Sequence, residues 1–491
     1  MGLGGRVTLT AFCAAIDGDA PLDVSAAVID RLRAARAPVD RLAAGAAPVY
    51  GLNTGLGGNL AHRLAPAEIP AFQRQLVEGR AVATGEALLE PMGRAMLLAR
   101  IVSAAAGRSG MSEVMFRHMI AVFDAGLSPV VPEFGSIGAA DLTVNAVWAQ
   151  GLLGRGGLWR ADRVLPGDEA LTQAGLVAPV LEPRDALALI NTGAFSVARA
   201  AFALQAARQG LDMAKGAILL SYAGYGANRE ILRADVNALR PAPGQAEAAA
   251  WFRRHLDGCE DAPRRVQEAL SFRLVATVTG AAQDALSRAI AVWEDEANAG
   301  ADSPSVLDGG EMVSTAHYHA PALALALEGV SLAMAMLANG AVQRVQKLMN
   351  PALSGLPKYL SPVGGASAGM VPMQKTCAAL LAEIRRHAMP VAFDPAPVSD
   401  SVEDMAAMTP LCAQKLAEQM HAFHLLAGTE ALAAAQALDL RAPGARSPAV
   451  AALHDAVRDR VEMLQDDRPL GGDIPRAAEA LRTVVAGLGG G

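Results

Sequence analysis

Apolar side chains recur at helical spacing along most of this chain. Between Pro91 and Ala106, for example, Met96, Leu97, Ile101 and Val102 fall on one side of a helical period. The same period recurs at 270–298, 320–349, 371–386 and 409–438. Glycine and proline concentrate between these stretches, at 50–58, 129–138, 241–244 and 361–369. The pattern predicts long helices joined by loops, and the loops are where a scaffold presents functional side chains.

One of these stretches is apolar on every side. From Ala320 to Val342 the only charged residue is Glu328, and the length approaches that of a membrane span. Glu328, Asn339 and two glycines argue against a lipid environment, and the centre of a large helix bundle requires the same composition. We therefore predict a buried core helix and no membrane segment.

Composition supports a mainly α fold. The chain has 491 residues, of which 52% are hydrophobic but only 4% aromatic, and alanine and leucine favour helix over strand. Length alone would suggest two or three domains. The net charge is -7 and no basic run is present, which argues against a nucleic-acid partner.

The cysteines and the N-terminal residues indicate the compartment. Cys13, Cys259, Cys377 and Cys412 show no CxxC spacing, so we expect small buried side chains in a reducing environment. The first twenty residues lack a charged region followed by a sustained apolar core, and therefore do not predict a secretion signal. We expect a cytoplasmic protein.

The segment at 129–143, PVVPEFGSIGAADLT, resembles the GSxGASGDL loop of the histidine and phenylalanine ammonia-lyases. In that family an Ala-Ser-Gly tripeptide cyclises to methylidene-imidazolone, and the serine hydroxyl is lost as water. This chain has Ala139-Ala140-Asp141 there, with no hydroxyl to expel. Ser136 is followed by the hindered nitrogen of Ile137, so a shifted cyclisation is not expected. The resemblance therefore implies the lyase fold without its prosthetic group or any other cofactor.

Seven further segments match motifs of the same family in the same order. They are YGLNTGLG at 50–57, ALALINTG at 186–193, QEALSFR at 267–273, EANAGADSP at 296–304, AHYHA at 316–320, NPALSGLP at 350–357 and VEDM at 402–405. The resemblance implies a long-helix bundle of the histidine/phenylalanine ammonia-lyase type. Residues 1–190 would carry the catalytic tyrosine loop and the altered loop. Residues 191–491 would form the central long-helix bundle and the C-terminal helices of one integrated unit.

The resemblance also implies the base and the carboxylate site. Tyr50 stands at the family's base position, but a free phenol titrates near about 10, so it needs a nearby cation such as Arg273 or Lys375. Arg273 matches the family's carboxylate-binding arginine, and Asn191 would add a hydrogen bond there. Gln267 is expected to brace its loop beside the substrate. A loop tyrosine packed at the surface is the alternative for Tyr50.

Two departures from the family pattern suggest that the protein binds a ring of the substrate. Lys375 replaces an aliphatic residue next to Gln374, and if it is buried it needs a partner such as Glu403. Glu403 stands at the position from which histidine ammonia-lyases bind the imidazole ring of the substrate. Lys375 would donate a proton or hydrogen bond to the ring while Glu403 orients a ring N–H. The alternatives are a surface lysine on a helix and an acid at a helix N-terminus.

Two further departures lie near the expected reaction centre. Tyr318 replaces a phenylalanine, and its ring could hold a quaternary ammonium by a cation–π attraction of about 1 to 2 kcal/mol. Arg80 replaces a histidine, either as a second carboxylate contact or as a structural residue. His317 and His319 have the spacing of an HxH zinc pair, but no further ligands accompany them, so we expect no metal.

These departures resemble the ergothionase branch of the family, whose substrate carries its own leaving group. A trimethylammonium leaves as neutral trimethylamine and needs no covalent activation, so a small betaine is the expected substrate. Ergothioneine and the related betaine hercynine both remain open, as do a histidine or aromatic amino acid ammonia-lyase and an inactive homologue that only binds. Family members are homotetramers whose active sites combine loops from three subunits, and the same assembly is expected here.

Overall fold

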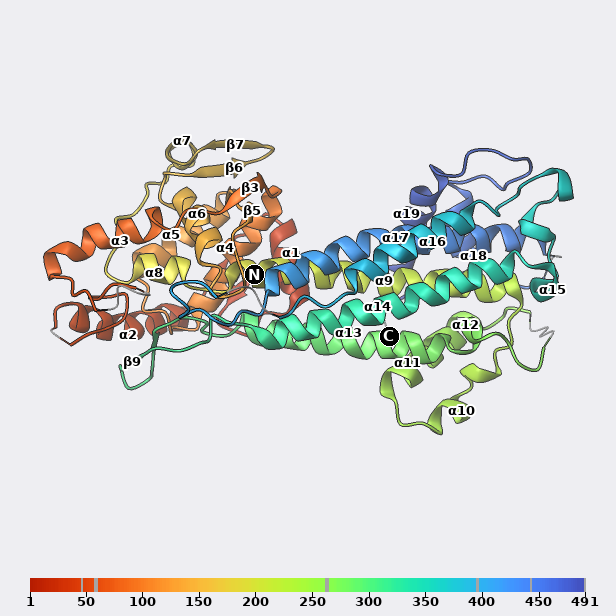
Figure 1. Cartoon of the computed structure of the whole chain (residues 1–491), viewed down its shortest axis with the longest axis horizontal. Coiled ribbons are helices and arrows are strands. Elements are labelled where there is room, and N and C mark those ends of the chain that lie inside the picture. Colours follow the sequence, from red (N-terminus) through yellow and green to blue (C-terminus); the bar gives the residue numbers. More distant parts are fainter. Residues whose placement is uncertain (46, 57–60, 261–264, 394–396, 442–443, 490–491) are drawn as a thin grey trace. The chain divides into compact units, whose positions relative to one another are not determined.

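The structure is a computed structural model that describes residues 1–45, 47–56, 61–260, 265–393, 397–441 and 444–489 (Figure 1). Its contacts group the chain into two compact units. The first comprises 1–202, 290–325 and 390–414, and the second comprises 203–289, 326–389 and 415–491. Long helices contribute residues to both units: α9 (Ala194–Tyr225), α13 (Val275–Ala297), α14 (Pro321–Leu348) and α17 (Thr409–Leu440).

The first unit contains shorter helices and small sheets. Its helices are α1 (Leu9–Asp17), α2 (Ala26–Ala43), α3 (Ile69–Glu78), α4 (Glu90–Ala105), α5 (Glu113–Asp124), α6 (Leu142–Leu152), α7 (Gly167–Gln173) and α8 (Asp185–Ile190). Its strands are β1 (Gly2–Leu3), β2 (Asp23–Val24), β3 (Thr84–Ala87), β4 (Leu127–Pro129), β5 (Pro132–Phe134), β6 (Gly157–Arg160), β7 (Arg163–Pro166), β8 (Ser305–Val306) and β9 (Met312–Val313). β4, β6 and β7 form an antiparallel sheet in that order.

Helix α4 forms the core of the first unit. All of its residues from Gly93 to Ala105 are buried. Gly93 lies so close to β4 that an added Cβ would stand 2.0 Å from the carbonyl oxygen of Pro129. Only glycine permits this approach. The buried Arg100 guanidinium forms a two-point ion pair with Asp302, which fixes the loop that follows α13.

The second unit adds α10 (Ala234–Ala238), α11 (Pro243–His255), α12 (Leu270–Arg273), α15 (Pro351–Ser354), α16 (Met373–His387), α18 (Pro448–Arg458) and α19 (Asp473–Val485). Helices α9 and α17 are rich in alanine, which favours helix and leaves little side chain between neighbouring backbones. A Cβ added to Gly224 of α9 would stand 3.0 Å from the carbonyl oxygen of Ala434 in α17. The sequence therefore sets a close helix–helix approach at this point.

A buried polar network connects helices of the second unit. Arg344 of α14 donates from Nε and Nη2 to the carboxylate of Glu430 in α17, at 2.6 and 2.9 Å. Ser221 of α9 donates to the same carboxylate at 2.7 Å, and Arg344 also donates to the carbonyl of Ser271 in α12 at 3.2 Å. The network therefore holds α12, the short helix that carries Arg273, against the long helices.

The predicted mainly α, long-helix architecture is confirmed, and four of the predicted helices correspond to α4, α14, α16 and α17 within two residues at each end. The stretch predicted at 270–298 is divided into α12 and α13 at Leu274. Helix α9 was not predicted, because its apolar residues surround the helix and leave no polar face to mark a period. Cys13, Cys377 and Cys412 are buried as expected, and Cys259 is partly buried.

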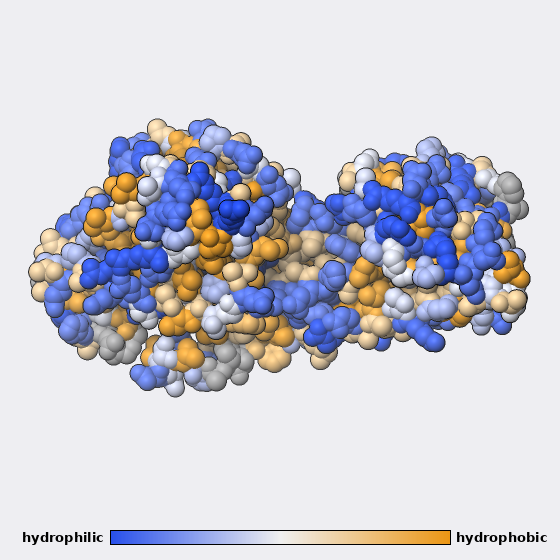
Figure 2. Space-filling model, turned by 90° about the horizontal axis from the view of Figure 1, so that it is seen from above, coloured by the Kyte–Doolittle hydropathy of each residue, from blue (hydrophilic) through white to orange (hydrophobic). Residues whose placement is uncertain are grey.

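The prediction that 320–342 is buried on all sides is wrong for the single chain. Leu325, Leu332 and Met336 of α14 are 67%, 50% and 60% exposed, and they follow one another at helical spacing. Single exposed apolar side chains are normal on a protein surface, whereas these three form a contiguous stripe. On the face shown in Figure 2, hydrophobic side chains are interspersed with hydrophilic ones.

Two described stretches are long and apolar enough to span a membrane by length and composition alone. They are Asp185–Tyr225, whose most apolar part is 89% buried within the protein, and Pro321–Leu348, whose most apolar part is 50% buried. Buried helices of large bundles pass the same test, so the absence of a membrane segment stays a prediction.

Candidate active site

The loop that carries Tyr50 is fastened by its own side chains. Asn53 accepts a hydrogen bond from the backbone N–H of Val49 and donates to the carbonyl of Ala47, both at 2.8 Å. Gly51 has a φ of +64°, and a Cβ added there would stand 2.3 Å from a methyl carbon of Leu187 in α8. The YGxNTG motif therefore fixes a tight turn packed on α8, with Tyr50 partly buried at its start.

Asn191 lies directly after α8, where it is held by the loop that follows α13. Its Nδ2 donates to the carbonyl of Ser303 at 2.7 Å. The buried Arg184 guanidinium donates to the same carbonyl and to that of Pro304, at 3.4 and 2.6 Å. One N–H of the Asn191 amide is thus used internally, and among the described residues no partner is found for the other.

The altered loop at 135–141 meets three other segments of the first unit. The backbone of Ala139 pairs with that of His319, and the N–H of Thr192 donates to the carbonyl of Ala140 at 3.3 Å. The N–H of Met408 donates to the carbonyl of Ile137 at 3.0 Å. The predicted segments at 186–193 and 316–320 are therefore brought to this loop.

The residues of this loop do not fit the cyclised prosthetic group. The nearest serine in the sequence, Ser136, donates from its hydroxyl to the carboxylate of Asp141 and accepts from the backbone N–H of Gly138 at 3.0 Å, as a turn-stabilising side chain does. Ala140 and Asp141 both adopt left-handed backbone conformations, with φ of 66° and 48°. A strained turn is present, but no β-hydroxyl stands between Gly138 and Asp141 for elimination.

Four predicted side chains of the first unit interact electrostatically. Burial lowers the pKa of the Arg80 guanidinium, while the Tyr50 and Glu403 side chains raise it. Burial raises the pKa of the Tyr318 phenol, and Tyr50 and Glu403 raise it further. Arg80 and Tyr318 are partly buried and Glu403 is exposed. Tyr50, Arg80, Tyr318 and Glu403 thus form one cluster.

A carboxyl pair under the altered loop was not singled out from the sequence. Asp141 is fully buried and accepts from the N–H and hydroxyl of Ser196 at 2.8 and 3.0 Å, and burial raises its pKa. Burial and the nearby Asp141 raise the pKa of Glu296 to about 7. The signal available in the sequence was the glutamate that opens the 296–304 motif.

The other predicted residues belong to the second unit. Arg273 is partly buried at the end of α12, and its guanidinium donates to the Gln267 side chain at 3.2 Å. Lys375 lies in the first turn of α16 and is exposed, so the expectation of a buried lysine is not met in the single chain. Its neighbour Gln374 lines a cavity of about 390 Å³ that also contains Lys347. The roles of all these residues stay predictions.

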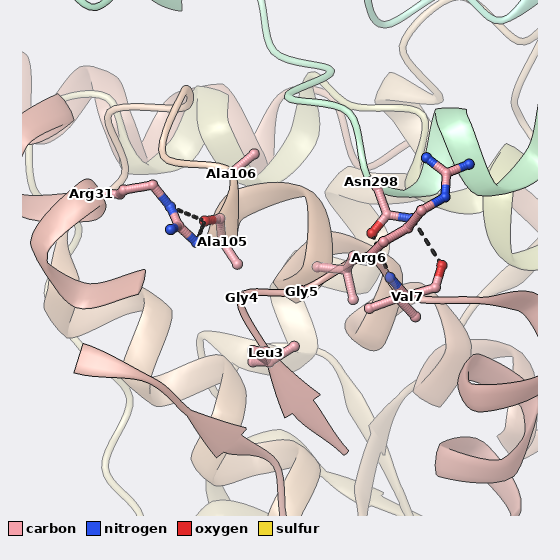
Figure 3. A pocket seen from close by; sticks show the side chains of 10 residues that line it. Leu3, Gly4, Gly5, Arg6, Val7, Arg31, Ala105, Ala106 and Asn298 are labelled. Atoms are coloured by element: carbon pink, nitrogen blue, oxygen red, sulfur yellow. Dashed lines mark hydrogen bonds between the residues drawn. The ribbon is translucent and has the colours of Figure 1, made fainter. Parts of the chain in front are cut away.

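A second cavity, of about 260 Å³, lies in the first unit away from the predicted residues (Figure 3). Its polar groups are satisfied internally. Asn298 exchanges hydrogen bonds with the backbone N–H and carbonyl of Val7, and Arg31 donates to the carbonyl of Ala105. Within the described part of the chain, no group of three or more His, Cys, Asp or Glu residues is placed to hold a metal ion, and the absence of a metal at His317 and His319 stays a prediction.

Comparison with known proteins agrees with this geometry. Residues 7–459 match the family described as aromatic amino acid lyase. The chain is 37% identical to a histidine ammonia-lyase from Anaeromyxobacter sp. (strain K), over 98% of this chain and 97% of that one. The chain belongs to the aromatic amino acid lyase family.

Solved structures of the aromatic amino acid lyase family share the whole fold. An ergothionase from Treponema denticola, crystallised with desmethyl-ergothioneine sulfonic acid, is 26% identical, with a TM-score of 0.94 and 99% of both chains covered. A histidine ammonia-lyase from Trypanosoma cruzi is 27% identical, with a TM-score of 0.91, covering 99% of this chain and 95% of that one. The predicted fold type is therefore confirmed, and the chain is a carbon–nitrogen lyase by family.

Proposed function

We propose that this lyase eliminates trimethylamine from ergothioneine or a related histidine betaine, without a methylidene-imidazolone group. The observation that carries the proposal is the loop at 138–141, which offers no serine for cyclisation. A lyase with this loop needs a substrate whose leaving group departs without covalent activation. The solved neighbour described as an ergothioneine degrading enzyme supports this choice of substrate.

The elimination balances with a single base. The Tyr50 phenolate takes the β-proton, the released electron pair forms the carbon–carbon double bond, and the carbon–nitrogen bond breaks with its pair on nitrogen. Trimethylamine departs neutral, and the product from ergothioneine is thiourocanate. No proton has to reach the leaving group, so the chemistry requires an acidic β-carbon more than an acid catalyst.

The ring supplies that acidity when it is protonated or hydrogen-bonded. Lys375 donates to the ring and Glu403 accepts from a ring N–H, so that charge developing at the β-carbon spreads into the heterocycle. Glu403 is held for this role by its backbone pairing with Val398 and by the Ser399 hydroxyl at 2.8 Å. Arg273 and Asn191 bind the carboxylate, and the Tyr318 ring faces the trimethylammonium.

The site is completed by partner subunits in a homotetramer. Lys375 is exposed in the single chain, and an idle lysine in that position would have no reason to replace an aliphatic side chain. The exposed apolar stripe Leu325, Leu332 and Met336 on α14 is suited to helix–helix association. Arg273, Gln267 and Lys375 then reach the Tyr50 cluster from other copies.

The second candidate function is histidine ammonia-lyase activity, which the 37% identical relative favours. Incubation with ergothioneine, hercynine and histidine separates the possibilities. We expect trimethylamine and a conjugated acrylate chromophore from a betaine, and no ammonia from histidine. Ammonia from histidine would overturn the proposal, and no turnover of either betaine would favour an inactive homologue that only binds.

The backbone of the loop at 138–141 is expected to remain uncyclised. Intact-mass spectrometry of the purified protein should give the mass required by its sequence, because Ala139 and Ala140 have no hydroxyl to lose. A mass lower by lost water, mapped to a peptide that contains the loop, would contradict the proposed mechanism.

Lys375→Ala is expected to lower turnover of the betaine by at least about 100-fold, because a positioned proton donor usually contributes that much to the rate. Because Lys375 is exposed on α16, helix content by circular dichroism should not change. Arg386→Ala is the matched control, since it removes an exposed positive charge from the same helix. Equal rates for Lys375→Ala and wild type would exclude ring activation by this residue.

A further inference from the structure

We infer that Asn145 of α6 is a positioning residue, which holds Asn191 and the altered loop at 135–141 in the arrangement that receives the substrate carboxylate. The inference rests on the proposed function, because Asn191 binds that carboxylate in the proposed reaction. Asn145 lies outside the motifs that the sequence matches to the family, so the sequence alone gave it no role.

The Asn145 side chain is fully buried and connects two segments of the first unit. Its Nδ2 donates to the carbonyl of Ala140 in the altered loop at 3.1 Å. The same nitrogen donates to the carbonyls of Ile190 and Thr192 at 3.0 and 2.7 Å, and these two residues flank Asn191 in the chain. Three surrounding carbonyls also decide which end of the amide is the nitrogen, since an oxygen there would be repelled.

These hydrogen bonds leave Asn191 little freedom. Its backbone N–H donates to the carbonyl of Leu187 at 2.9 Å, and its Nδ2 donates to that of Ser303 at 2.7 Å. Because Asn145 fixes the backbone on both sides, Asn191 is held in place before a ligand arrives. An amide that is already oriented loses less entropy when it binds a carboxylate. Asn145 therefore strengthens that contact without touching the substrate.

The altered loop requires such support. Ala140 and Asp141 adopt left-handed backbone conformations in succession, with φ of 66° and 48°, which are unfavourable for residues with a Cβ. Conformations of this kind persist only where the surrounding contacts determine them. The carbonyl of Ala140 accepts from Asn145 and also from the N–H of Thr192 at 3.3 Å. The loop and the segment that follows α8 are therefore fixed to each other.

The Asn145 amide is oriented for these carbonyls at the expense of its own oxygen. Its Oδ1 is buried and has no hydrogen-bond partner among the described residues, which costs free energy. The buried Asn237 of α10 differs in this respect. Its Nδ2 donates to two backbone carbonyls at 2.9 Å, and its Oδ1 accepts from Gln245 at 2.9 Å. Asn237 is thus an asparagine of similar burial whose whole amide contributes to stability.

The kinetic constants for the betaine test the inference. Asn145→Leu keeps a side chain of similar size but removes the donor, and kcat/KM should fall by about 10-fold to 100-fold, as for a lost hydrogen bond to a charged group. The loss should appear in KM, because the carboxylate is bound equally in the ground and transition states. Asn237→Leu is the matched control in the second unit, and it should lower stability without changing KM.

A double-mutant cycle separates positioning from a merely structural role. Asn191→Ala should raise KM by a similar factor, and adding Asn145→Leu should raise it by no more than about 2-fold further, because Asn145 acts through Asn191. Two losses that multiply in full would overturn the inference, as would an unchanged KM in Asn145→Leu. Asn145→Ser, which retains a single donor, replaces Asn145→Leu should the latter not fold, and it should also raise KM.

Hydrogen exchange followed by mass spectrometry tests Asn145 without any substrate. Peptides that cover 139–145 and 190–196 should exchange faster in either Asn145 variant than in wild type, while peptides from α11 should not change. Equal exchange in all peptides would overturn the inference. Inactivity of the wild type towards every betaine would count against the proposed function, while the exchange would still decide whether Asn145 holds the Asn191 segment.

Discussion

Tyr50→Phe is expected to lower kcat/KM for the betaine by about 100-fold to 10,000-fold, the usual contribution of a positioned general base. The substitution removes one oxygen and leaves the ring that packs at the start of the fastened turn. The Asn53 hydrogen bonds to Val49 and Ala47 do not involve the phenol, so the loop should keep its conformation. Steady-state kinetics on the same substrate panel measures the effect.

The split between kinetic constants makes this test specific. Loss of the base should lower kcat with little change in KM, because the phenol acts on the β-proton in the transition state. Tyr359→Phe is the matched control, since this partly buried tyrosine belongs to the second unit and lies outside the predicted motifs. A Tyr50→Phe enzyme within a few-fold of wild type would require another base.

Glu430→Ala is expected to destabilise the protein by about 3 to 5 kcal/mol, since it leaves the buried Arg344 guanidinium without its counter-charge. The side chains of the pair are 4% and 1% exposed, so water cannot replace the lost carboxylate. Urea denaturation followed by circular dichroism measures the loss as a lower midpoint.

Two comparisons isolate the cause. Glu479→Ala breaks an exposed pair with Arg482 in the same unit and should cost no more than about 1 kcal/mol. Replacing both members of the buried pair by Arg344→Met and Glu430→Leu should recover part of the loss, because no unpaired charge remains. If Glu430→Ala cost as little as Glu479→Ala, the network would not be a source of stability.

The sequence was sufficient for features that depend on local spacing. The helical periods predicted α4, α14, α16 and α17, and the turn around Tyr50 is set by Asn53 and Gly51 within its own motif. These signals need no knowledge of distant residues.

Features that depend on distant parts of the chain could not be read in this way. The electrostatic effect of Tyr50 on Arg80, 30 positions further along the chain, depends on how α3 and the Tyr50 turn both pack on α8. The effect of Asp141 on Glu296 likewise joins a loop to a helix far along the chain. The exposure of Lys375 depends on how α16 packs against its neighbours. The amphipathic period of this helix does not determine that packing.

The path of the chain limits how this enzyme can be dissected. Residues 290–325 and 390–414 return to the first unit after the chain has entered the second. A single cleavage leaves the first unit incomplete, because a piece ending near residue 202 would lack the two stretches that carry Tyr318 and Glu403. Chimeras between family members should therefore exchange all three stretches of a unit together, and proteins made by a single crossover are expected to be insoluble or inactive.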